Sequence, residues 1–138
     1  MNNSSLASEF LVRAFRNIKE AKIALEDGDY YHVCVRCLEA LDNIAKSILA
    51  LYGVYSASDD PVPLLEYLKE TRELDEELNK LIDIIQDEER KLKIIARIDE
   101  ASLKGDTVII RRKEAEIQLA EIEKVFEKAQ EEFDKFHS

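Results

Sequence analysis

Apolar residues recur along this chain at alternating steps of four and three, the spacing that places side chains on one face of an α-helix. The pattern is clearest between Asp29, which can cap the start of a helix, and Gly53, which can end one in a left-handed conformation. The stripe between them consists of Tyr30, Cys34, Cys37, Leu41, Ile44, Ile48 and Leu51. We therefore expect a helix over this segment, with the rest of the chain arranged around it.

Similar patterns predict further helices over residues 5–27, about 74–98 and about 111–136, and a short helix that starts at Pro61 or Pro63. Residues 26–29 allow only an antiparallel return, so the first two helices form a hairpin. Glu88 and Glu89 interrupt one stripe at positions that should be buried. Either that helix protrudes there, or it kinks, or a partner supplies the missing base, and we favour protrusion. Residues 99–110 predict an ordered loop. Extra apolar positions that could build a dimer face are Ile109, Ile110, Ile117 and Val125.

These elements predict an all-α fold, an antiparallel up-and-down bundle of four to five helices that forms a single domain over residues 1–138. A chain of 138 residues can bury a core without disulfides or metals. No apolar run approaches the ~20 residues of a membrane span, and the N-terminus lacks the pattern of a signal peptide. We expect a cytoplasmic protein that does not enter a membrane.

Charge is distributed unevenly along the chain. The net charge of -10 argues against a broad nucleic-acid surface, but residues 90–113 hold eight bases and three acids. Arg111 and Arg112 would start the last helix, where positive charge is unfavourable by roughly 0.3–1 kcal/mol each. Either neighbouring acidic helices neutralise these bases, or a phosphate-bearing or acidic partner binds there.

Candidate catalytic and metal-binding chemistry is sparse. Cys34 and Cys37 form a C-x-x-C, but both lie inside a helix on its apolar stripe, which indicates core packing. His32 points about 200° away from Cys34 on a helix, so the two cannot share a metal. The second histidine, His137, is the penultimate residue. We assign no catalytic residue, no metal site and no cofactor.

The order of several short motifs resembles the HEPN domain family (higher eukaryotes and prokaryotes nucleotide-binding), in its small prokaryotic form. These motifs are ALEDGDY at 24–30, LEALDNIAKSILALYG at 38–53, PLLEYL at 63–68, ARIDEA at 96–101 and IIRRKEAEIQL at 109–119. Asp42 and Lys46 stand where the family carries an acid and a lysine four apart. The resemblance implies a bundle that dimerises and pairs with a minimal nucleotidyltransferase.

Two departures from the family pattern bear on activity. The R-x(4–6)-H motif that marks metal-independent ribonucleases in the family is absent, and Asp59 stands where relatives often carry a histidine. We therefore favour a protein that is not an enzyme: a non-catalytic module of a toxin–antitoxin-like system that dimerises, pairs with a nucleotidyltransferase and binds a nucleotide or RNA. The alternatives are a diverged HEPN ribonuclease toxin and a purely structural homodimer. The residues expected to bind a nucleotide or partner are Arg36, Asp42, Lys46, Arg97, Arg111 and Arg112.

Overall fold

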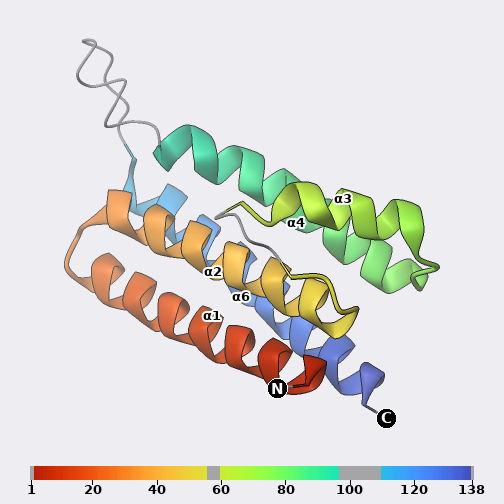
Figure 1. Cartoon of the computed structure of the whole chain (residues 1–138). Helices are drawn as coiled ribbons and strands as arrows, with labels where there is room; N and C mark the ends of the chain where they lie inside the picture. The colour runs from red at the N-terminus through yellow and green to blue at the C-terminus, as the bar shows by residue number, and fades with distance from the viewer. Residues whose placement is uncertain (1, 56–59, 97–109, 138) are drawn as a thin grey trace.

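The structure is a computed structural model that describes residues 2–55, 60–96 and 110–137 (Figure 1). Within these ranges the regular structure is entirely helical. The helices are α1 (Asn3–Glu26), α2 (Tyr30–Leu51), α3 (Val62–Thr71), α4 (Glu76–Ala96) and α6 (Arg112–Phe136). The four long helices lie within about two residues of the ranges that the apolar spacing predicts, and α3 starts between the two predicted prolines. The predicted all-α bundle is therefore confirmed. The predicted loop at 99–110 lies outside the described residues except for Ile110.

The turn between α1 and α2 and both ends of α2 are set by local sequence signals. The carboxylate of Asp29 accepts a hydrogen bond from the backbone N–H of His32 at 3.3 Å, which caps α2. Gly28 in the turn and Gly53 after α2 both have a φ of 74°, where a side chain would be strained. After α2 the N–H of Val54 donates to the carbonyl of Leu49 at 2.9 Å and closes the helix end.

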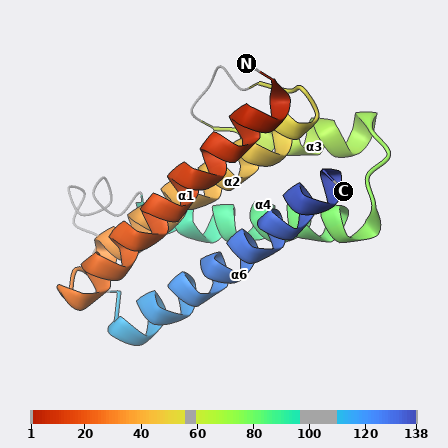
Figure 2. The same cartoon turned by 90° about the horizontal axis from the view of Figure 1, so that it is seen from below.

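The central element of the bundle is α2, which contacts each of the other four described helices. Twelve of its 22 residues are buried, more than in the other helices that surround it. Figure 1 shows α1 and the α3–α4 pair on opposite sides of α2, and Figure 2 shows α6 running beside α1 on the face away from α3. Most side chains of the predicted stripes are buried between these helices. The buried ones are Ala7, Leu11, Ala14, Ile18, Ala21, Cys34, Cys37, Leu41, Ile44, Ile48, Leu51, Leu78, Leu81, Ile82, Ile85, Leu92, Ala115, Leu119, Ile122, Phe126 and Ala129.

The expectation that α4 protrudes at Glu88 and Glu89 is wrong. Glu88 is only 5% exposed and Glu89 only 3%. The amide of Gln118, on α6, donates to the Glu88 carboxylate at 2.7 Å, and Glu89 faces α2. Because a residue of α6 contacts Glu88 and a residue of α2 contacts Glu89, α4 stays packed against the bundle at these positions.

The four extra apolar positions do not form one exposed face. Val125 is 2% exposed inside the bundle, and Ile110 packs against the same core. Ile117 is 54% exposed on the outer side of α6, and Ile109 lies outside the described residues. In the part of the chain that is described, no helix has the length and hydropathy that crossing a membrane requires.

Candidate functional site

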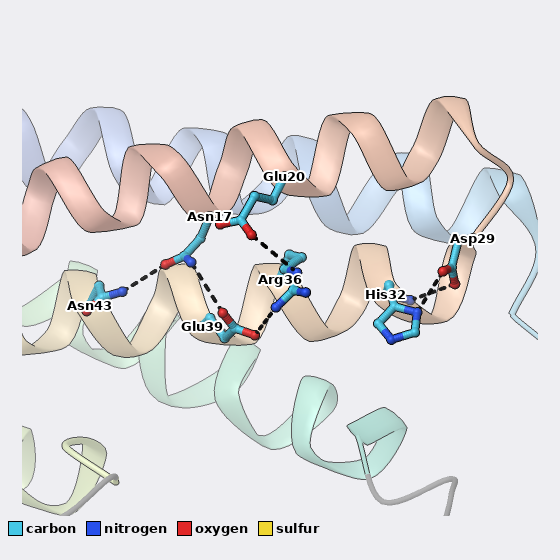
Figure 3. A network of polar contacts seen from close by, with 7 residues as sticks. All are labelled: Asn17, Glu20, Asp29, His32, Arg36, Glu39 and Asn43. Atoms are coloured by element: carbon cyan, nitrogen blue, oxygen red, sulfur yellow. Dashed lines mark hydrogen bonds and ion pairs between the residues drawn. The ribbon is translucent and has the colours of Figure 1, made fainter.

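A band of polar side chains follows the line where α1 packs on α2, and we call it the polar seam (Figure 3). It consists of Asn17 and Glu20 from α1 and of Arg36, Glu39 and Asn43 from α2. Asn17 is 9% exposed; its amide N–H donates to Glu39 at 3.3 Å, and its oxygen accepts from Asn43 at 2.8 Å. The seam therefore joins the two helices through a buried amide that is satisfied on both sides.

The predicted site residue Arg36 belongs to this seam. Its guanidinium donates to Glu39 at 2.7 Å and lies 3.7 Å from a carboxylate oxygen of Glu20. The side chain is 35% exposed, so the two carboxylates offset its charge in a partly shielded place. An anionic ligand would have to compete with both acids for this arginine.

His32 lies one helical turn before Arg36, and its ring Nδ1 is 2.7 Å from the Asp29 carboxylate. Asp29, His32 and Arg36 line a shallow hollow of about 390 Å³ together with Glu20 and Asp27. The acids in this hollow outnumber the bases, which makes it unfavourable for a phosphate group.

His137 directly follows the last turn of α6, and its Nδ1 donates to the carbonyl of Phe133 at 2.7 Å. Its Nε2 is 2.5 Å from the hydroxyl of Ser4, at the start of α1. His32 lies in the first helical turn of α2, next to the opposite end of α1. The two histidines are thus separated by the length of that helix and cannot act together.

The predicted residue Lys46 lies in a groove of about 330 Å³ between the first half of α1 and the end of α2. Its ammonium is 6.0 Å from the ring centre of Phe10, and the guanidinium of Arg13 is 5.3 Å from the same ring. Val54 and Tyr55, which follow α2, line the end of the groove. This α1–α2 groove therefore combines two cations with two aromatic rings, although Phe10 and Arg13 were missed as site residues by sequence reasoning.

The predicted acid of the pair, Asp42, lies at a different side of α2 from the polar seam. Its carboxyl group faces Glu89 on α4. Burial, and next the nearby Glu89 carboxylate, raise the pKa of Asp42 to about 8, while the Lys46 ammonium partly opposes the rise. Asp42 and Lys46 are therefore near enough to interact, although Lys46 also lines the α1–α2 groove and Asp42 faces α4.

The basic residues at the start of α6 are paired with acids of the same helix. Arg111 contacts Glu114 at 3.1 Å and Arg112 contacts Glu116 at 2.7 Å. These are exposed pairs, which contribute only about 0–1 kcal/mol and exchange easily with water or another anion. Arg97 lies outside the described residues.

The two cysteines are core residues, as the sequence predicts. Cys34 is 2% exposed and Cys37 0%, and both are free thiols. Burial raises the pKa of Cys34 to about 11 and that of Cys37 to about 12, so neither thiol is activated. Within the described ranges, His, Cys, Asp and Glu side chains form no group of three that could hold a metal ion.

Comparison with known proteins gives a family and a fold. The sequence profile of the HEPN domain matches residues 7–132. The crystal structure of TT1696 from Thermus thermophilus is similar, with a TM-score of 0.65 and 21% sequence identity over 95% of this chain and 98% of that chain. At this identity the similarity describes the fold alone. None of the curated proteins compared with the chain matches it.

Proposed function

Because this chain belongs to the HEPN domain family, we propose that it is a non-catalytic HEPN module that dimerises and pairs with a minimal nucleotidyltransferase in a toxin–antitoxin-like system. The observation that supports the non-catalytic part of the proposal is the position of Arg36 between the carboxylates of Glu20 and Glu39. A phosphate of an RNA would have to displace two acids, from two helices, before it could bind this arginine. The sequence also lacks the R-x(4–6)-H motif of the family's ribonucleases.

The α1–α2 groove is the place where this module would bind a nucleotide. Its volume of about 330 Å³ falls at the lower end of the ~300–1,000 Å³ range typical of ligand pockets, which suits a single nucleotide. Lys46 and Arg13 would contact the phosphates, and Phe10 or Tyr55 would stack on the base. The acid that pairs with Arg13 is the exposed Glu9, at 2.6 Å, and a phosphate can displace an exposed acid of this kind.

Isothermal titration with ATP tests this assignment. We expect Lys46→Gln to weaken binding by about tenfold or more, because a charge-assisted hydrogen bond contributes ~1.5–3 kcal/mol. Lys19→Gln is the matched control: Lys19 also lies over a phenylalanine ring, that of Phe15, at 4.8 Å, but it does not line the groove. Equal affinities for wild type and Lys46→Gln, or no binding of ATP at all, would contradict a nucleotide site here.

The dimer is tested by the mass of the purified chain in solution. One chain has a mass of 15.9 kDa, and light scattering should give twice that value across a tenfold dilution. A mass of one chain at every concentration would refute the dimeric part of the proposal.

A diverged ribonuclease is the second candidate, and one observation favours it. His32 lies one turn from Arg36 in the same hollow, and Asp29 orients its ring. A histidine oriented by an acid can transfer a proton, and the arginine beside it could bind a phosphate that displaces Glu20 and Glu39. This candidate predicts that the purified chain cleaves labelled RNA and that His32→Gln abolishes the cleavage. RNA that stays intact at a large molar excess of protein excludes it.

A further inference from the structure

Five charged groups gather where α4 packs against α2 and where the chain enters α3. Three are acids, Asp42 on α2, Asp60 before α3 and Glu89 on α4, and two are bases, Lys46 on α2 and Lys93 on α4. The Lys93 ammonium lies 2.7 Å from Asp60 and 3.5 Å from Glu89. We call this group the α2–α4 charge cluster.

The carboxyl groups of Asp42 and Glu89 face each other directly, within hydrogen-bonding reach. Glu89 is 3% exposed, and one oxygen of each group, Asp42 Oδ1 and Glu89 Oε2, is buried and accepts no hydrogen bond from a donor of the described residues. Lys93 reaches the other oxygen of Glu89. Two ionised carboxylates in this position would repel each other and leave two buried oxygens unsatisfied.

One added proton removes both difficulties. A protonated carboxyl group donates a strong hydrogen bond to the carboxylate opposite, which satisfies an oxygen of each side chain. It also lowers the negative charge of the cluster, because two carboxylates rather than three then lie near Lys46 and Lys93. Burial and the facing Glu89 raise the pKa of Asp42 to about 8, and burial raises the pKa of Glu89 as well, so the pair holds a proton at neutral pH.

We propose that Asp42 and Glu89 share one proton, and that this proton binds α4 to α2, so that the contact between these helices weakens as the pH rises. The inference does not depend on the nucleotidyltransferase or on nucleotide binding, since it concerns only packing inside the bundle. Its consequence is a bundle whose α4 side responds to pH near neutrality.

The sign of the effect follows from proton linkage. Unfolding exposes Asp42 to water, where its carboxyl group has its ordinary pKa of about 3.9 and releases the proton. Between about pH 4 and pH 8 the folded chain therefore binds one proton more than the unfolded chain, and stability falls as the pH rises. Above that window the loss is complete and the dependence on this pair ends.

The test compares urea unfolding of wild type and Asp42→Asn from about pH 5 to pH 8.5. Asparagine donates to Glu89 without a titrating proton, so the wild type should lose stability relative to the variant. The unfolding constant of the wild type divided by that of Asp42→Asn should rise by up to about tenfold per pH unit. This ratio should level off near pH 8. Glu127→Gln, at an exposed acid on α6, is the charge-matched control, and its ratio to wild type should stay nearly constant.

A ratio for Asp42→Asn that does not change with pH overturns the proposal, because a merely structural defect shifts stability equally at every pH. If Asp42→Asn does not fold, Glu89→Gln is measured in the same way and should give the same slope. Carboxyl ¹³C NMR provides an independent readout in the wild type. A resonance assigned to Asp42 or Glu89 should titrate above pH 7, and titration of both near pH 4 contradicts a shared proton.

Discussion

Removal of the Asn17 side chain tests whether the polar seam holds α1 on α2. Asn17→Ala deletes a buried amide that bridges Glu39 and Asn43 from opposite sides. Nothing else among the described residues connects these two side chains. The substitution therefore breaks the seam at its centre and leaves the apolar stripes of both helices unchanged.

The expected loss can be worked out from the two hydrogen bonds. The bond from Asn43 is short, at 2.8 Å, whereas the bond to Glu39 is long, at 3.3 Å, and Glu39 keeps its contact with Arg36. Glu39 and Asn43 are both partly exposed, so water can reach them after the change. Each lost bond should then cost ~1 kcal/mol, and the variant should lose about 2 kcal/mol of unfolding free energy.

Urea unfolding followed by circular dichroism measures this loss, and a thermal scan should show a Tm lower by roughly 5–10 °C. Gln130→Ala is the matched control, because Gln130 is an amide on the exposed face of α6 and should change stability by less than about 0.5 kcal/mol. If Asn17→Ala costs no more than Gln130→Ala, the polar seam is a surface feature that does not stabilise the hairpin.

Three further substitutions or treatments test the local structure. Gly53→Ala should cost about 1–2 kcal/mol in urea unfolding, because a side chain at a φ of 74° is strained; an unchanged midpoint would contradict that geometry. Asp29→Ala should cost about 1 kcal/mol by the same measurement, since it removes the cap of α2. Cys34 and Cys37 should react with Ellman's reagent only after unfolding in urea, because both thiols are buried and their pKa values are raised.

The helices could be predicted from the sequence because their signals are local. The four-three spacing, the cap at Asp29 and the left-handed end at Gly53 each depend on a few neighbouring residues. Partners that are distant along the chain could not be predicted in this way. Glu88 is buried against Gln118, which lies far after it in the sequence. Glu89 is buried against Asp42, which lies far before it. The local pattern therefore predicted that α4 protrudes at Glu88 and Glu89, whereas other helices of the bundle supply partners for both carboxylates.

The sequence indicates which residues could bind a nucleotide or partner, but not how the bundle groups them. Arg36 and Lys46 do lie along the contact between α1 and α2, but in separate places, the polar seam and the α1–α2 groove. Their neighbours on α1 were missed, although Asn17 beside the apolar Ile18 is a signal, since a polar residue next to a buried stripe often has a partner. Roles that depend on how two helices are rotated against each other cannot be obtained from either helix alone.

A common feature of these observations is that α2 presents different chemistry on different sides. Arg36 belongs to the polar seam and Asp42 to the α2–α4 charge cluster, whereas Lys46 lines the α1–α2 groove and also acts on the charge of Asp42. The remaining side holds the apolar core that includes Cys34 and Cys37. Variants of Arg36 and of Asp42 therefore change separate sites, whereas Lys46→Gln changes the groove and also the charge near Asp42.

The most direct test of the proposed function is the mass of the complex that the chain forms with a minimal nucleotidyltransferase from the same genome. The two proteins are produced together and separated by gel filtration with light scattering. We predict one species that contains both chains, with at least two copies of the 15.9 kDa HEPN chain. Separate elution of the two proteins at micromolar concentration, each with the mass it has alone, would contradict the pairing on which the account depends.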